Sequence, residues 1–244
     1  MMEDPELPPT ESGLRALLRQ RADTPPLNPH LDNGPWDFLT RASAGIVESR
    51  VRPLLHELAG DDDALVRQRA LEVLMQLPTR AETIARLLDL ARHKAWTGQA
   101  RTRLEHALAN WCDGSGRETE IASVLADLAQ ADDRLPAAPV AVVLGVRAPD
   151  AAVSIVARHA GPGAEAFSAD VASMFARFHP DRVLALLGKM RALSSSGKQR
   201  VLTQLKTDLA LPPDARARLA AVYGVTPSAS MLPTLEACAA ALGV

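Results

Sequence analysis

The chain has 244 residues, of which 47% are hydrophobic and only 3% aromatic, and its formal net charge at pH 7 is −2. This length allows a substantial core in one or two domains, and the near-neutral charge is not the global profile of a nucleic-acid-binding protein. No segment approaches the roughly 20 apolar residues of a membrane helix, so we expect no membrane partner. Cys112 and Cys238 are far apart in the sequence and do not make a disulfide framework, so we expect a cytoplasmic protein.

The N-terminal region is predicted to be separate from the main body. Residues 1–9 are acidic and Pro-rich and lack the apolar stretch of a secretory signal. A short helix is predicted from Glu11 to Arg21, because three leucines fall on one face of it: Leu14, Leu17 and Leu18. Residues 23–35 are dense in Pro, Asn and Gly, which is typical of a linker. We therefore expect a flexible arm over 1–35 and a helical domain over 36–244.

The main body is predicted to be all-α. Its apolar residues are mostly Ala, Leu and Val, and the first two are strong helix formers. From Ser49 onward they recur with a period near 3.6, which indicates one buried face per helix. The clearest stripe lies within residues 62–77 and contains Val66, Ala70, Val73, Leu74 and Leu77. Another contains Trp96, Leu104, Leu108 and Trp111, which predicts that both tryptophans pack in the core.

The nearly continuous apolar run from Val140 to Val146 is compatible with a buried strand or a buried helix. Because the segments on both sides have helical periodicity, we predict a helix there. Glycines and prolines separate the predicted helices, and the helices begin roughly every 16 residues, so that a helix pair spans about 30–35 residues. That spacing lies within the range of helical repeat proteins.

In residues 51–77, Pro53 and two leucines occupy the first predicted helix, Asp61 lies in the turn, and Val66-Arg67 opens the second predicted helix. This pattern resembles a HEAT repeat. The resemblance implies that Asp61 and Arg67 link neighbouring repeats, and that the fold is a right-handed α-solenoid of antiparallel helix pairs. No second Asp-x-x-x-x-Val-Arg pattern occurs. The remaining helices are either degenerate repeats or a non-repetitive bundle, and we favour a solenoid that becomes irregular toward the C-terminus.

No side-chain pattern predicts a catalytic, cofactor-binding or metal site, and we expect no cofactor. His106 and Cys112 are six residues apart, whereas metal ligands on one helix face would be four apart. The segment 194–198 resembles the end of a phosphate-binding loop only in part, because Ala192 and Gln199 stand where that loop requires Gly and Ser or Thr.

Two clusters of basic residues are candidate partner-binding surfaces. The first basic cluster consists of Arg86, Arg92, Lys94, Arg101 and Arg103. An acidic residue, Asp89, lies among them in the sequence. The second basic cluster has no acidic residue within it and contains Lys189, Arg191, Lys198, Arg200 and Lys206. Basic helix faces attract acidic partners or phosphate groups, while the alternative is that both clusters are ordinary solvated surface.

These observations favour a non-catalytic protein–protein interaction module, such as a bacterial adaptor, assembly or partner-neutralising protein. The alternative is a DNA glycosylase for alkylated bases, since some bacterial enzymes of this class are built on HEAT-like repeats, and Trp111 and Asp113 would then be the groove residues. The acidic net charge and the scarcity of aromatic residues disfavour this nucleic-acid-binding alternative. A third possibility is a chromophore-attaching lyase, since some bacterial proteins of that class have HEAT-like repeats, but no residue of this sequence supports it. The partner's identity and the oligomeric state stay open.

Overall fold

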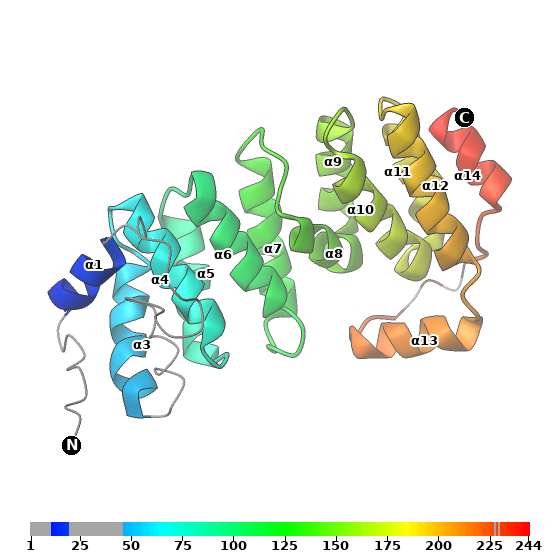
Figure 1. Ribbon diagram of the computed structural model, residues 1–244. Helices are drawn as coiled ribbons and strands as arrows, with labels where there is room; N and C mark the ends of the chain where they lie inside the picture. Colours follow the sequence, from blue (N-terminus) through cyan, green and yellow to red (C-terminus); the bar gives the residue numbers. More distant parts are fainter. Residues whose placement is uncertain (1–10, 20–45, 227, 229) are drawn as a thin grey trace, which may run out of the picture. The chain divides into compact units, whose positions relative to one another are not determined.

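The computed structural model describes residues 11–19, 46–226, 228 and 230–244. Throughout these ranges the ordered elements are helices and none is a strand (Figure 1), so the prediction of an all-α fold is confirmed. The chain forms two compact units, of which the first ends at Trp111 and the second begins at Cys112. The predicted domain boundary at residue 35 lies outside the described residues.

The first unit contains five described helices: α1 (Glu11–Arg19), α3 (Ile46–Leu58), α4 (Ala64–Gln76), α5 (Ala81–His93) and α6 (Gly98–Asn110). The predicted stripe of α4 is its buried face, with Val66, Ala70 and Leu74 fully inaccessible to solvent. Helix α4 begins where it does because the Asp63 carboxylate accepts a hydrogen bond from the Leu65 amide, which is an N-cap.

The second unit begins with α7 (Glu118–Gln130), α8 (Ala138–Arg147), α9 (Pro149–His159) and α10 (Glu165–Phe178). A 3₁₀ turn (Pro180–Arg182) then leads into α11 (Val183–Lys189), α12 (Ser195–Leu209), α13 (Pro213–Val222) and α14 (Leu235–Leu242). The run from Val140 to Val146 is helical, as predicted, and it forms the centre of α8. Almost all of its side chains are buried, which explains why it shows no polar face.

Within each unit the helices contact their next-but-one neighbours. Helix α4 packs against α6, and α3 against α5, in the first unit. In the second unit α10 lies between α8 and α12, while α7 contacts α9 and α9 contacts α11. Alternate helices of each unit are therefore arranged in two layers, and side chains between the layers form the core.

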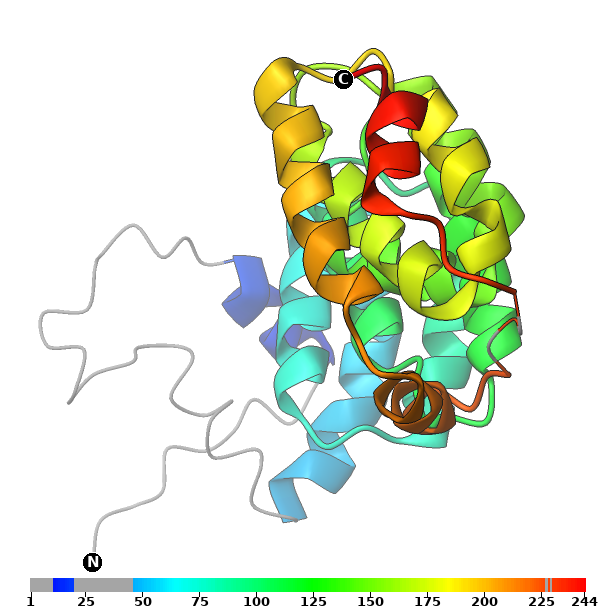
Figure 2. The ribbon, with the colours of Figure 1, turned by 90° about the vertical axis from the view of Figure 1, so that its right-hand side faces the viewer.

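Helix α13 departs from this arrangement. It lies crosswise to α12, so that Figure 1 shows it lengthwise below α12 and Figure 2 looks along its axis. It packs against α10, where Ala220 joins a cluster with Val146, Met174 and Phe178. The chain then returns to the two-layer arrangement, because α14 packs against α11 and α12.

Gly145 marks a close contact between α8 and α10, and replacing it with alanine is expected to destabilise the protein. A Cβ atom at this position would lie 2.7 Å from the Cβ of Met174, which cannot move away without its backbone. Overpacking of this kind lowers stability by roughly 1–3 kcal/mol, which exceeds the gain of about 1 kcal/mol in helix propensity. We expect a net loss of about 1 kcal/mol in a urea unfolding titration.

Gly188 in α11 provides the matched control, because no atom lies within 4 Å of a Cβ built there. Gly188→Ala is expected to raise the free energy of unfolding by about 0.5–1 kcal/mol, since only the helix propensity changes. Equal effects of the two substitutions, in either direction, would contradict the assignment of Gly145 to a steric contact.

Candidate interaction surfaces

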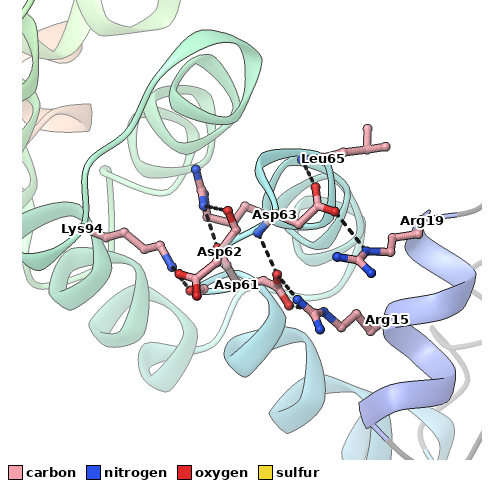
Figure 3. A network of polar contacts seen from close by, with 9 residues as sticks. Arg15, Arg19, Asp61, Asp62, Asp63, Leu65 and Lys94 are labelled. Atoms are coloured by element: carbon pink, nitrogen blue, oxygen red, sulfur yellow. Dashed lines mark hydrogen bonds and ion pairs between the residues drawn. The ribbon is translucent and has the colours of Figure 1, made fainter.

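Asp61, one of the two residues of the repeat-like motif, joins the turn between α3 and α4 to helix α1. Its carboxylate accepts hydrogen bonds from Arg15 Nη2 and from the Asp63 amide, both at 2.8 Å. Two positions along, Asp63 accepts a hydrogen bond from Arg19 Nε at 2.9 Å. Figure 3 shows Arg15 and Arg19 reaching from α1 to this acidic turn. Asp61 is therefore an anchor between consecutive helical elements of the first unit.

Arg67, the other motif residue, holds its own turn and also contacts a residue before α6. Its Nη1 donates to the carbonyl oxygens of Asp61 and Asp62 at 2.6 and 3.0 Å. Its guanidinium lies 5.7 Å from the ring centroid of Trp96, close enough for a cation–π interaction. Trp96 is a core residue as predicted, 7% exposed, and its indole nitrogen donates to the Leu90 carbonyl at 2.9 Å.

Most of the first basic cluster forms ion pairs inside the first unit. Four of its members have carboxylates within 4 Å, in the pairs Arg86–Glu57, Arg86–Asp89, Lys94–Asp62, Arg101–Glu105 and Arg103–Glu72. The pair Arg86–Glu57 connects α5 to α3, and Arg103–Glu72 connects α6 to α4. Arg92 is exposed. The cluster therefore links helices of this unit and is not a continuous positive surface.

The prediction that Arg101 belongs to a partner-binding surface is wrong, because its side chain is buried. Only 2% of Arg101 is exposed, and its Nε lies 2.7 Å from Oε1 of Glu105, which is itself 1% exposed. Both residues lie one turn apart on α6, which contacts α4 and α5. A partner could reach this guanidinium only if the helix packing opened.

The second basic cluster lies on α11, on α12 and on the connection between them. No carboxylate comes within 4 Å of any of its five cations in the part of the chain that the structure describes. Arg191 donates to the Ala241 carbonyl at 2.9 Å and Lys198 to the Gly243 carbonyl at 3.5 Å. Both cations thus lie at the negative end of the α14 dipole. The remaining three, Lys189, Arg200 and Lys206, are exposed.

Lys206 also lines an open groove between α12 and α14 with a volume of about 510 Å³. Its other lining side chains include both apolar and polar residues: Gln199, Leu202, Thr203, Leu235, Glu236 and Ala239. The groove therefore combines apolar side chains with one cation and one carboxylate. Of the second basic cluster, Lys206 lines it.

The residues considered for other chemistry are engaged in structural contacts. The Asp113 carboxylate accepts from Arg147 Nη2 at 2.8 Å, and the same nitrogen donates to the Tyr223 carbonyl at 2.7 Å. Burial raises the pKa of the Cys112 thiol to about 11, so that it is protonated at neutral pH. Trp111 is half-buried. In the described ranges no three His, Cys, Asp or Glu side chains gather as metal ligands would.

The polar contacts of α1 are expected to weaken in acid. Desolvation raises the pKa of Asp61, but the hydrogen bonds from Arg15 and the Asp63 amide, with the charges of Arg15 and Arg19, outweigh it and leave this pKa below 3.8. When the pKa of a carboxyl group is lower in the folded state than in the unfolded state, its charge stabilises the fold fully at pH values above the unfolded-state pKa. This stabilisation is lost as the pH falls through the folded-state pKa. Between about pH 5 and pH 2, wild type should therefore lose more stability than Asp61→Asn.

Urea unfolding midpoints measured across this pH range test the expectation. Asp61→Asn keeps an acceptor for the Asp63 amide, so its effect reports mainly the lost charge. An identical acid dependence in wild type and variant would show that Asp61 does not link α1 docking to protonation.

The contact between α1 and the acidic turn was not among the features predicted from the sequence. The residues involved are 44 and 46 positions apart in the two pairs, so no local pattern relates them. The available signal was complementary charge, since Arg15 and Arg19 directly follow Leu14 and Leu18 of α1 and three consecutive aspartates lie in the turn.

Comparison of the chain with protein-family models, with curated proteins and with solved structures found no match. No helix in the described ranges combines the length and the apolar character needed to traverse a membrane.

Proposed function

We propose that this chain is a non-catalytic protein-interaction scaffold, built as an α-solenoid of antiparallel helix pairs similar to HEAT repeats. The contacts between next-but-one helices support this architecture, because stacked helix pairs bring equivalent helices of successive repeats together. The motif residues fit it as well, since Asp61 is bound by α1 and Arg67 packs on Trp96. Solenoids expose extended surfaces, which suit them to binding other proteins.

The second basic cluster carries the functional proposal. Unlike Arg86, Lys94 and Arg103 of the first cluster, its members have no carboxylate within 4 Å in the described chain. Unpaired cations attract acidic partners over a long range and steer their association. The neighbouring groove adds Leu202 and Leu235 beside Lys206. We therefore propose an acidic protein segment with adjacent apolar side chains as the ligand of this surface.

Affinity capture from the native lysate, with and without nuclease, tests the proposal. Tagged wild type is compared with Arg200→Glu/Lys206→Glu, which leaves the α14-binding Arg191 and Lys198 intact. The matched control, Arg50→Glu/Arg92→Glu, makes the same change in net charge at exposed positions of the first unit. We expect a nuclease-resistant protein partner to be retained by wild type and control and to be reduced at least tenfold by the first variant.

Two outcomes would contradict the proposal. Equal retention by both variants would remove the second basic cluster from the binding surface. Recovery of nucleic acid, with all protein partners lost after nuclease treatment, would favour the nucleic-acid-binding alternative over a protein scaffold.

A further inference from the structure

Helix α1 binds the rest of the first unit as an amphipathic ligand binds a receptor. Leu14 and Leu18 lie one turn apart and are each 1% exposed, and the contacts of α1 are with α3 and α4. A helix of nine residues is too short to be stable alone in water. Its helical structure therefore depends on the surface that it covers.

Polar contacts on both sides of the leucines fix the position of α1. Arg15 and Arg19 form ion pairs with Asp61 and Asp63 at 2.6 and 2.9 Å. At the end of the helix, Arg69 of α4 donates through Nη1 to the Leu18 carbonyl at 2.5 Å. The receptor surface thus combines an apolar centre, an acidic rim and a donor for the last turn of the bound helix. We call the surface of α3, α4 and the Asp61–Asp63 turn the α1 docking site.

We propose that the α1 docking site binds an amphipathic basic helix of a partner protein, and that α1 is a tethered occupant that this helix must displace. The recognised pattern is leucine at positions i and i+4 with arginine at i+1 and i+5, as in Leu14, Arg15, Leu18 and Arg19. The charge of the rim selects a basic helix, which distinguishes this site from the second basic cluster. The two surfaces belong to different units, and this inference does not rest on the ligand proposed for the second basic cluster.

The tether explains why a foreign helix is the expected occupant and a second copy of α1 is not. Residues 20–45 connect α1 to α3, and covalent attachment places a ligand at an effective concentration of millimolar order. At micromolar protein concentration, the chain's own α1 therefore outcompetes the identical helix of another copy. A longer partner helix with the same pattern buries more apolar surface than nine residues and can displace α1.

A peptide-binding titration on the full-length protein tests the proposal. The probe is a fluorescein-labelled peptide with the sequence of residues 11–19, and Arg15→Glu/Arg19→Glu is introduced into the protein so that its own α1 is repelled by the acidic rim. We expect this variant to bind the peptide about tenfold more tightly than wild type, since a tethered competitor at about 1 mM occupies most sites of the wild-type protein. A control peptide with glutamate in place of both arginines should not bind.

Further variants show whether the peptide occupies the inferred site. Adding Asp61→Asn/Asp63→Asn to the first variant should abolish peptide binding, while α4 stays capped because Asn is also a good N-cap residue. Leu14→Ser/Leu18→Ser is a second way of releasing α1 and should also increase peptide affinity. Circular dichroism confirms that each variant retains the helices of the remaining chain.

Three results would overturn the proposal: equal peptide affinity of wild type and both released variants, no binding to any protein, or binding that survives Asp61→Asn/Asp63→Asn. Sedimentation analysis provides an independent check. A wild-type dimer that becomes monomeric on Arg15→Glu/Arg19→Glu would identify the occupant as a second copy and would also overturn the assignment to a partner helix.

Discussion

Replacing Arg177 with methionine is expected to lower the free energy of unfolding by about 3 kcal/mol, because it leaves a buried carboxylate without its cation. Asp208 on α12 is fully buried, and both Nε and Nη2 of Arg177 on α10 lie 2.7 Å from its Oδ1. Among the residues that the structure describes, the one further side-chain donor to this carboxylate is Gln204 Nε2, which lies 3.2 Å from Oδ2. Methionine retains the apolar stem of arginine, so the substitution removes mainly the charge.

The double variant Arg177→Met/Asp208→Leu separates the lost charge from lost packing. Replacing a whole buried ion pair with apolar side chains is often neutral or stabilising, so we expect the double variant to be more stable than Arg177→Met alone. Urea denaturation followed by circular dichroism measures both. A loss below about 1 kcal/mol for Arg177→Met would mean that water reaches Asp208 at little cost.

Arg101→Met is the second substitution with a large expected effect, again about 3 kcal/mol. Arg101 and Glu105 are 2% and 1% exposed, and Arg101 Nε lies 2.7 Å from Glu105 Oε1, so that the substitution breaks a buried ion pair. This result would also show that Arg101 has a structural role.

Arg218 on α13 offers a matched control for Arg101. It forms an ion pair with Asp214 at the same spacing of four residues, but the two side chains are 75% and 67% exposed. Exposed helical pairs contribute roughly 0.3–0.5 kcal/mol, so Arg218→Met should change the free energy of unfolding by no more than about 0.5 kcal/mol. Similar losses in the two variants would show that burial is not what makes the Arg101 pair important.

The hydrophobic pattern was sufficient to predict the helices. Val66, Ala70 and Leu74 share a face and are fully buried, and the apolar run of α8 is a helix surrounded by other helices. These features are local: a period of 3.6 residues identifies a helix, and flanking Gly and Pro residues identify its ends. The short helix predicted from Glu11 to Arg21 is present over the described part of that range, Glu11–Arg19.

The candidate surfaces depended on contacts that no local pattern contains. Arg101 and Arg200 look alike in the sequence, yet one is buried beside Glu105 and the other is exposed, because helix packing decides which face of α6 or α12 meets solvent. Likewise Arg15 binds Asp61 across 46 residues and Arg177 binds Asp208 across 31. Local periodicity by itself determined which segments are helical, whereas only the tertiary structure decided which charges are neutralised, because ion pairing depends on distances between helices far apart in the chain.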